Sequence, residues 1–276
     1  MTELSLWFPA FAPLAAILIP LVGGGLVLAL GRHPNRREAA TLGTSGILFL
    51  VVLSLLPRVL EGDRPGLVLA EPLPGLSISL EVEPLGLLFA LVASSLWIVT
   101  SLYSIGYMKD RPRQREYFTY LLWTLGISCG VVLANDLVML LVCWGFLGLT
   151  LYLMAGMSGP GAAEAARKSL MIIGGSDALM LLGILIYWHL AGTTRMDGGA
   201  LPLDSPLAYT AFLTLVAGAF AKAGAVPFHS WVPPFGEHAD APVSAFLPAS
   251  LDKLLGIYLL ARCVMDLFAP TPAMYG

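Results

Sequence analysis

Residues 219–248 read AFAKAGAVPFHSWVPPFGEHADAPVSAFLP, and this stretch joins two apolar runs of the chain. It contains five prolines together with lysine, histidine and acidic side chains. Proline removes a backbone donor and breaks a helix, and irregular backbone at membrane depth must be buried in protein or line a wet cavity. The sequence therefore predicts a discontinuous transmembrane helix with its break near residues 219–242. Ion pathways are commonly built from such helices.

The composition of the whole chain places it in a membrane. Of its 276 residues, 57% are hydrophobic and 12% are charged, whereas soluble domains carry roughly 25% charged residues. The apolar runs predict an all-α, multi-pass protein of the cell (inner) membrane with about eight transmembrane helices. Residues 57–79, which have mixed charge and many Pro and Gly, are predicted to form a long loop. We expect the spans at residues 4–30, 40–56, 82–108, 117–133, 137–157, 167–190, 207–224 and 243–264.

The sequence gives no sign of a cofactor. Its three cysteines lie within apolar runs without CxxC pairing, so neither a disulfide framework nor a zinc or iron–sulfur site is predicted. No nucleotide, flavin or nucleic-acid motif stands out. We therefore expect no cofactor, no nucleic-acid partner and no catalytic site in this chain, and any redox chemistry belongs to another subunit.

Lysine and arginine near the span ends indicate the orientation of the chain. Three basic segments, residues 32–37, 109–115 and 167–168, fall on one side of the membrane under the expected span order. The loops on the other side, residues 58–71 and 191–204, are acidic or mixed. This distribution predicts that the basic loops are cytoplasmic and that the N-terminus is outside.

The stretch around the break also carries a family resemblance. KAGAVPFHSW at residues 222–231, followed by APVSAFL at 241–247, resembles the broken seventh helix and its exit in the antiporter-like, proton-conducting subunits of respiratory complex I, Mrp cation antiporters and membrane-bound hydrogenases. The resemblance covers roughly residues 81–264. It implies three N-terminal transmembrane helices in residues 1–110 and one five-helix antiporter-type half-repeat in residues 111–276.

The resemblance makes Lys222 the central proton-relay group, since this family carries a lysine there on its broken helix. Counting the helical rise from Pro206 puts Lys222 about 24 Å into the bilayer, and counting from Val243 puts Lys253 about 15 Å down. A desolvated lysine is suited to a relay because it can gain and lose a proton near neutral pH. The structural alternatives are that Lys222 snorkels to the near interface and that Asp252 neutralises Lys253.

Two departures from the family pattern affect the partners of this lysine. Related subunits have a Trp-Glu phrase on the fifth helix, whereas here Trp144 is followed by Gly145. Span eight has Pro248 where many relatives have histidine, and Lys253 stands one residue earlier than the family lysine. Asp177, which resembles the family's Gly-Asp before a Leu-Leu-Gly-Ile run, is the candidate substitute for the missing acid, and a packed, hydrogen-bonded acid is the alternative.

His229 belongs to the family phrase, and a histidine at a channel mouth can exchange protons with water. Lys168 begins the helix that carries Asp177 but points to the opposite face, so an interfacial anchor is the alternative to a relay role. Glu237, His238 and Asp240 are expected to lie in a solvated loop. The candidate proton or ion path therefore consists of Lys222, His229, Lys253, Asp177 and Lys168.

These sequence features are compatible with two alternative functions. In the first, the chain is an integral membrane subunit that forms part of a proton (or sodium) translocation path in a redox-driven or exchange-driven complex. In the second, it is a non-pumping scaffold that anchors a soluble enzyme of the hydrogenase or inorganic-carbon-uptake type. Gly145 favours the scaffold, whereas Lys222 and His229 favour the path.

Family members repeat the five-helix unit in inverted orientation, and the predicted spans of this chain account for one unit. Inverted repeats build their site at the interface of the two halves. We therefore expect other multi-span membrane subunits in the surrounding lipid bilayer to supply the inverted half-repeat, with a peripheral redox or carbon-uptake module as a further partner.

Overall fold

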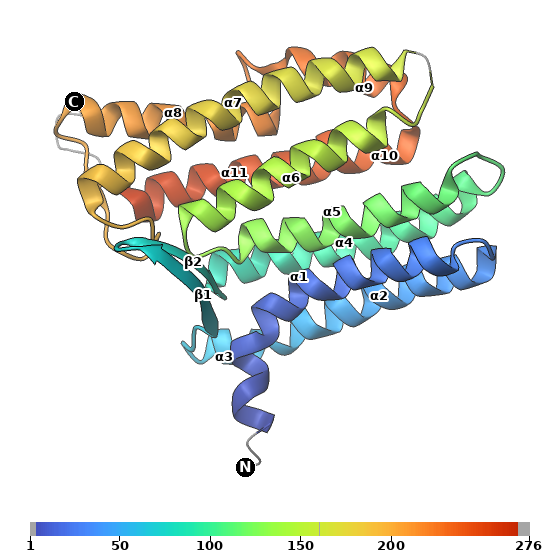
Figure 1. The fold of residues 1–276 in the computed structure, drawn as a ribbon, viewed down its shortest axis with the longest axis horizontal. Helices are drawn as coiled ribbons and strands as arrows, with labels where there is room; N and C mark the ends of the chain where they lie inside the picture. Colours follow the sequence, from blue (N-terminus) through green and yellow to red (C-terminus); the bar gives the residue numbers. More distant parts are fainter. Residues whose placement is uncertain (1–3, 160, 270–276) are drawn as a thin grey trace.

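The computed structural model describes residues 4–159 and 161–269, and they form a bundle of helices with a β-hairpin across one end (Figure 1). The strands are β1 (Gly66–Leu73), β2 (Leu76–Glu81), β3 (Leu201–Pro202) and β4 (Phe268–Ala269). The helices are α1 (Leu4–Leu30), α2 (Pro34–Ser54), α3 (Leu56–Leu60), α4 (Pro84–Met108), α5 (Gln114–Val132), α6 (Leu137–Ala155), α7 (Ala162–Ala191), α8 (Pro206–Ala223), α9 (Val232–His238), α10 (Ala241–Phe246) and α11 (Asp252–Arg262).

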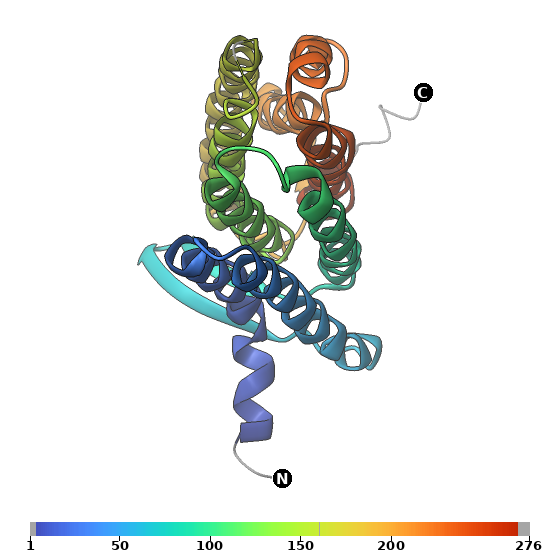
Figure 2. The ribbon, with the colours of Figure 1, turned by 90° about the vertical axis from the view of Figure 1, so that its right-hand side faces the viewer.

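The chain is a multi-pass membrane protein, and its helices confirm seven of the eight predicted spans. Seen nearly end-on in Figure 2, most of the helices run side by side, with α1 and α2 along one edge of the bundle. Seven segments of the described residues are long and apolar enough to cross a membrane: Ala10–Leu30, Pro34–Leu60, Pro84–Met108, Leu137–Ala155, Ala162–Ala191, Pro206–Ala223 and Ala241–Leu267.

The remaining predicted span, residues 117–133, corresponds to α5. This helix is 19 residues long, but Arg115 and Glu116 near its start make it less apolar than the other spans. It packs against α1, α4 and α6, and most of its side chains are buried by them. A helix that is surrounded by protein exposes little surface to lipid and so needs less apolar character.

The segment predicted as a long loop, residues 57–79, is largely structured. It contains α3 and most of the antiparallel β1–β2 hairpin, in which Leu67 pairs with Leu80. The turn uses Gly75 in the left-handed conformation (φ 74°), where a Cβ would collide with the carbonyl oxygen of Gly192. The alternating sequence LSISLE of β2 is typical of a half-buried strand and was the available signal.

Asp136 fastens this hairpin to the bundle. It is the N-cap of α6, where Oδ1 accepts hydrogen bonds from the amides of Val138 (2.9 Å) and Met139 (2.8 Å). Its Oδ2 accepts from the amide (2.5 Å) and hydroxyl (3.2 Å) of Ser79 in β2. Burial raises the pKa of Asp136, and the hydrogen bonds to its carboxylate act in the opposite direction.

We expect Asp136→Ala to destabilise the protein by about 2–4 kcal/mol, because it removes a helix cap and leaves the buried Ser79 amide without its acceptor. Thermal unfolding in detergent should show a melting temperature lower by several degrees. Asp110→Ala, which changes an exposed aspartate, is the matched control. Equal melting temperatures for the two variants would contradict the fastening role.

The broken helix is also confirmed. Helix α8 ends at Ala223, and Gly224 takes the left-handed conformation (φ 65°) that closes it. The chain then turns, forms a single 3-10 turn at His229–Trp231 and continues as α9. The last span is interrupted as well, since a π-helical turn at Leu247–Leu251 separates α10 from α11 and a second one at Cys263–Leu267 follows α11. Such π turns are rare and are frequently found at functional sites.

Candidate functional site

Lys222 lies at the centre of the candidate site and is completely buried in the last turn of α8. Its Nζ donates a hydrogen bond to the carbonyl oxygen of Trp144 in α6 at 3.3 Å. The same atom lies 3.7 Å from Oδ1 of Asp252 and 5.3 Å from the centre of the Trp144 ring. A cation buried in a membrane protein is tolerated when it is paired with such groups. Three helices, α6, α8 and α11, therefore hold one buried charge pair.

Local packing explains why Asp252 reaches this position. Helix α11 approaches α8 at Gly256, where a Cβ would lie 2.6 Å from the carbonyl oxygen of Ala219. The π-helical turn that precedes α11 sets the rotation of its first residue, Asp252, which is buried. The glycine permits the close approach and the turn directs the carboxylate toward Lys222.

Lys253 is turned away from the pair. The sequence allows Asp252 to neutralise its neighbour Lys253, but the structure pairs Asp252 with Lys222 instead, and Lys253 is exposed. Consecutive residues of a helix differ in direction by about 100°, so both cannot face α8. In this chain the carboxylate beside Lys222 therefore comes from span eight.

Asp177 is the second acid of the site. It is half-buried in α7, close enough for its charge to act on Lys222, and it faces the Trp144 indole without forming a hydrogen bond to it. Among the described residues, three buried side-chain atoms here have no hydrogen-bond partner: Nε1 of Trp144, Oδ1 of Asp177 and Oδ2 of Asp252. Buried polar atoms are nearly always satisfied. The two carboxylate oxygens can each accept a further hydrogen bond, and the indole Nε1–H of Trp144 can donate one.

The other predicted path residues lie outside this cluster. His229 is exposed in the 3-10 turn beyond the break, and Lys168 is exposed near the start of α7. Gly145 is exposed as well, and a Cβ there would meet no described atom within 4 Å. The structure thus brings together Lys222 and Asp177 of the predicted set and adds Asp252 and Trp144.

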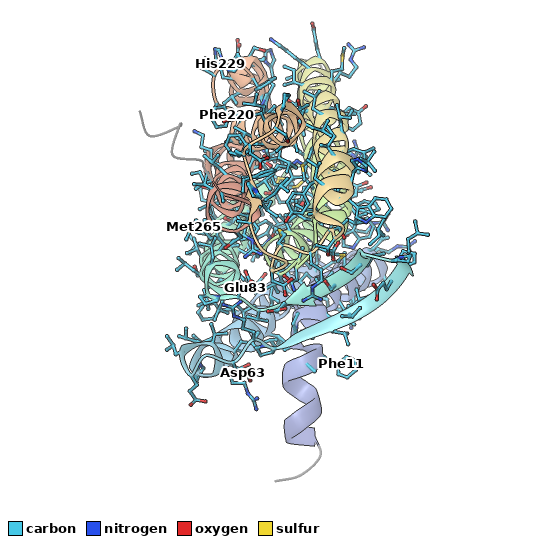
Figure 3. The ribbon with its side chains drawn as sticks, turned by 90° about the vertical axis from the view of Figure 1, so that its left-hand side faces the viewer. Phe11, Asp63, Glu83, Phe220, His229 and Met265 are labelled. Atoms are coloured by element: carbon cyan, nitrogen blue, oxygen red, sulfur yellow. The ribbon has the colours of Figure 1, made fainter. Side chains whose placement is uncertain are left out.

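A second charged group at the hairpin end was missed by sequence reasoning. Arg262, at the end of α11, is buried, forms an ion pair with Glu83 at the start of α4 and lies 3.2 Å from Asp266. Glu83 is labelled beside the hairpin in Figure 3. The available signal was an arginine inside the last apolar run, because an intramembrane arginine nearly always has an acidic partner or a function.

Glu81 and Arg195 extend this charged end. Arg195 contacts Asp197 at 2.6 Å and Glu81 at 3.8 Å, and Asn135 donates a hydrogen bond to Glu81 at 2.7 Å. Burial is the main cause that raises the pKa of Glu81, and Asp197 adds to it. The hydrogen bond from Arg195 lowers the pKa of Asp197. The pKa values of Glu81 and Asp197 are therefore shifted in opposite directions.

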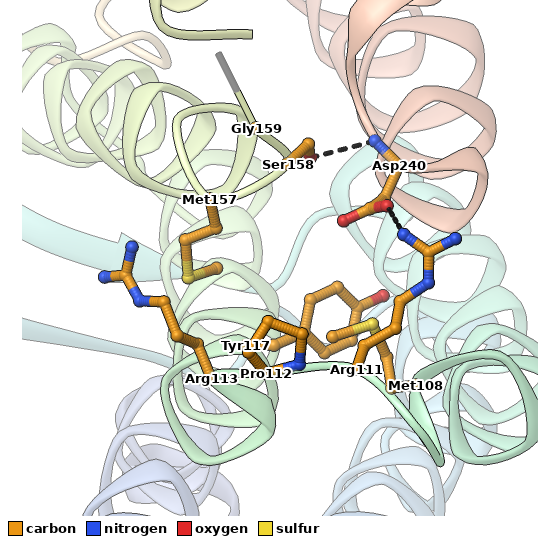
Figure 4. A pocket seen from close by; sticks show the side chains of 9 residues that line it. All are labelled: Met108, Arg111, Pro112, Arg113, Tyr117, Met157, Ser158, Gly159 and Asp240. Atoms are coloured by element: carbon orange, nitrogen blue, oxygen red, sulfur yellow. Dashed lines mark hydrogen bonds and ion pairs between the residues drawn. The ribbon is translucent and has the colours of Figure 1, made fainter.

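At the opposite end, a cavity of about 190 Å³ opens beside the turn between α9 and α10 (Figure 4). Asp240, expected in a solvated loop, is half-buried there and forms an ion pair with Arg111. The amide of Asp240 donates to the hydroxyl of Ser158 at 2.9 Å. Tyr117 at the wall of the cavity hydrogen-bonds Ser104 at 2.8 Å. The bundle thus has a polar opening at the end where α8 breaks.

Two family models match the chain. Residues 134–275 match the model described as NADH:quinone oxidoreductase/Mrp antiporter, TM, and residues 74–118 match the model described as NADH-Ubiquinone oxidoreductase (complex I), chain 5 N-terminus. The first match includes Trp144, Asp177, Lys222 and Asp252.

Curated relatives share similarity along most of this chain. The chain is 32% identical over 266 residues to the Na(+)/H(+) antiporter subunit A1 of Staphylococcus haemolyticus, covering 92% of this chain and 32% of the relative. It is 30% identical over 260 residues to NADH-quinone oxidoreductase subunit L of Mycobacterium tuberculosis, covering 89% of this chain and 41% of the relative. The chain thus spans about a third to two fifths of the length of these relatives.

Solved structures share the fold. The Mrp complex from Dietzia sp. contains a chain that superposes with a TM-score of 0.84 at 19% identity, covering 95% of this chain and 49% of that one. Respiratory complex I from Thermus thermophilus contains a chain with a TM-score of 0.73 at 22% identity, covering 94% and 54%. The archaeal membrane-bound sulfane sulfur reductase gives a TM-score of 0.76 at 21% identity, covering 90% and 40%.

Proposed function

This chain belongs to the NADH:quinone oxidoreductase/Mrp antiporter transmembrane family, and from that premise we propose that it forms part of a proton (or sodium) translocation path. The path passes through the buried Lys222 at the break of α8. The chain is a membrane subunit related to Mrp antiporters and to complex I subunit L. In the proposal it works within a redox-driven or exchange-driven complex and carries no catalytic site of its own.

The observation that carries the proposal is the buried pair of Lys222 and Asp252, whose charged atoms lie 3.7 Å apart. While the carboxylate is near and ionised, the lysine keeps its proton. When the carboxylate is protonated or moves away, a desolvated lysine binds its proton less tightly and can pass it on. The family resemblance implies an acid at the position of Gly145, and in the proposal Asp252 provides it here from another helix.

Polar groups at both ends of the bundle support a continuous route. On the side of the break, His229 is exposed and the cavity at Asp240 is open. At the other end, Glu81 combines partial burial with a raised pKa, which suits a group that exchanges protons with water. We propose that Asp177 lies beside this route, next to Lys222. In the proposal, the exposed side chains of Lys168 and Lys253 lie where the route continues into neighbouring subunits.

We further propose that the basic loops are cytoplasmic, that the N-terminus is outside and that the membrane is the cell (inner) membrane. Residues 1–110 serve as three N-terminal helices and residues 111–276 as the half-repeat. The structures that match belong to multi-subunit membrane complexes. Other multi-span subunits therefore complete the path in this proposal, with a peripheral redox or carbon-uptake module as a further partner.

The scaffold function is the second candidate, and the specific observation in its favour is Gly145. This residue gives no side chain at the position where the family resemblance implies an acid, and it lies on an exposed face. A scaffold requires the fold and its partner surfaces but no protonatable pair in the membrane.

The two functions are separated by measuring ion movement directly. The complex is purified with its native partners and reconstituted in liposomes, where a pH-sensitive dye reports proton movement under an imposed sodium or redox gradient. Replacing sodium with choline distinguishes the two ions. The path predicts dye responses above those of empty liposomes, whereas assembly without any ion movement would support the scaffold.

Asp177→Asn tests the second acid. If Asp177 helps to set the charge state of Lys222, the variant should lower transport by roughly tenfold or more while the complex still assembles. Asparagine keeps the shape and can still face the Trp144 indole. Loss of assembly with normal transport per assembled complex would show that Asp177 is a packing residue.

A further inference from the structure

A basic groove lies between the α1–α2 turn and the α4–α5 turn, at the same end as the cavity of Figure 4. Five arginines line it, and Glu116 is the one acid among its described lining residues. The groove is broad and open and has a volume of about 490 Å³. Its arginines are Arg32, Arg37, Arg111, Arg113 and Arg115.

Arg37 gives the groove a fixed floor. Arg37 is 5% exposed, and it donates hydrogen bonds to the side chain of Gln114 (2.5 Å) and to the carbonyl oxygen of Gly31 (3.4 Å). Its Nη2 also lies 3.5 Å from Oε1 of Glu38, with which it forms an ion pair. The guanidinium also lies 5.3 Å from the ring centre of Phe118. Its buried Nε has no hydrogen-bond partner among the described residues. Buried polar atoms are nearly always hydrogen-bonded, so the unused Nε donor of this guanidinium is a place where a bound anion could accept a hydrogen bond.

Three of the cations remain available to a ligand. Arg111 is paired with Asp240. By contrast, the side chains of Arg32, Arg113 and Arg115 form no ion pair or hydrogen bond with the part of the chain that the structure describes. A cluster of unpaired like charges is unfavourable by itself. A bound anion would relieve that repulsion.

The backbone around the groove adds positive character. Pro34, the first residue of α2, lines it, and α2 has neither a side-chain cap nor an acid in its first turn. The free amides at such a helix start favour a negative charge. Arg113 has φ 60°, a left-handed conformation that is uncommon outside glycine, and it holds this arginine at the turn before α5. Strained residues of this kind cluster at ligand sites.

We propose that this groove binds a phosphate group, supplied by the headgroup of an anionic phospholipid. Guanidinium groups match phosphate oxygens with paired, charge-assisted hydrogen bonds. The groove lies where several membrane spans end, which is the level of lipid headgroups, and basic pockets at this level bind anionic lipids. Free phosphate shares the same chemistry and is the other possible source of the group.

The test compares lipids and variants on the full chain, extracted in mild detergent as it is assembled in the membrane. Native mass spectrometry measures binding of phosphatidylglycerol and of phosphatidylcholine, and inorganic phosphate is titrated separately. The main variant replaces Arg32, Arg113 and Arg115 with glutamine. The control replaces Arg36, Lys109 and Arg167, three exposed cations of the same end that do not line the groove, with glutamine.

The proposal predicts that phosphatidylglycerol binds more tightly than phosphatidylcholine. The groove variant should weaken that binding by roughly 100-fold, because each basic side chain contributes about fivefold near an anionic headgroup, and the control should change it far less. Arg113→Gly removes one cation while suiting the left-handed backbone, and about a fivefold loss is expected. Tight binding of inorganic phosphate with no preference between the lipids would identify free phosphate as the source. Equal losses in groove and control variants, or no binding of either probe, would overturn the proposal.

Discussion

Lys222→Ala is expected to reduce ion movement in reconstituted liposomes by roughly 100-fold, to the level of empty vesicles, while the complex still assembles. The reason is that the proposed path runs through the completely buried amine of Lys222 at the break of α8, which the variant removes. Asp252 can then become neutral by taking up a proton, so the buried site need not retain an unpaired charge. In the same preparation, dye responses measure the loss of ion movement and native mass measurements show whether the complex still assembles.

Lys222→Arg makes the test sharper. Arginine keeps the positive charge opposite Asp252 but does not release its proton in proteins, so the pair persists without a working relay. Transport should therefore be lost in Lys222→Arg as in Lys222→Ala. Lys109→Ala is the matched control, since Lys109 is exposed and lies outside the proposed path. Normal transport in either Lys222 variant would remove the main support for the path and favour the scaffold.

Asp252→Asn is expected to lower both transport and stability. Breaking a buried ion pair by removing one partner costs about 3–5 kcal/mol, because the remaining group must either stay charged without compensation or change its protonation state. Asp252 is 2% exposed and Lys222 is fully buried, so solvent cannot replace the lost carboxylate. Transport measured per folded complex should fall by roughly tenfold or more, because the lysine has lost the acid that controls its proton. Thermal unfolding and dye assays measure the two effects separately.

Two further variants distinguish a controlling acid from a structural one. In Lys222→Met with Asp252→Leu, both charges are replaced together, which should restore most of the stability and none of the transport. Adding Gly145→Glu to Asp252→Asn should not rescue transport, because Gly145 faces away from the described atoms of the bundle. Recovery of transport in the Gly145→Glu background would mean that the site accepts its acid from α6 as well.

The sequence was sufficient to predict most of the helical layout, because apolar length is a local property. It also identified the break, since Pro227 and its neighbours exclude a continuous helix. The β1–β2 hairpin was missed because its strands are short, and the mixed charge and glycines of residues 57–79 resemble those of a loop. Its position depends on Asp136, whose contacts with Ser79 join residues 57 apart in the sequence.

The candidate site was predictable only in part. Lys222 could be found from its motif and depth, and Asp177 from its position in an apolar helix. The role of Asp252 could not be predicted from the neighbouring sequence. The π-helical turn before Asp252 changes the rotation of α11, and as a result Asp252, not Lys253, faces α8. Arg262 was overlooked because it stands close to the end of its span.

The π-helical turn at Leu247–Leu251 has an evolutionary consequence. Its hydrogen bonds span five residues where those of an α-helix span four, so one residue inserted or deleted there converts one kind of turn into the other. Because the turn itself takes up the extra or missing residue, the residues that follow keep their direction, and Asp252 still faces Lys222. Helix α11 can therefore tolerate a change in length of one residue at this turn without losing the buried charge pair.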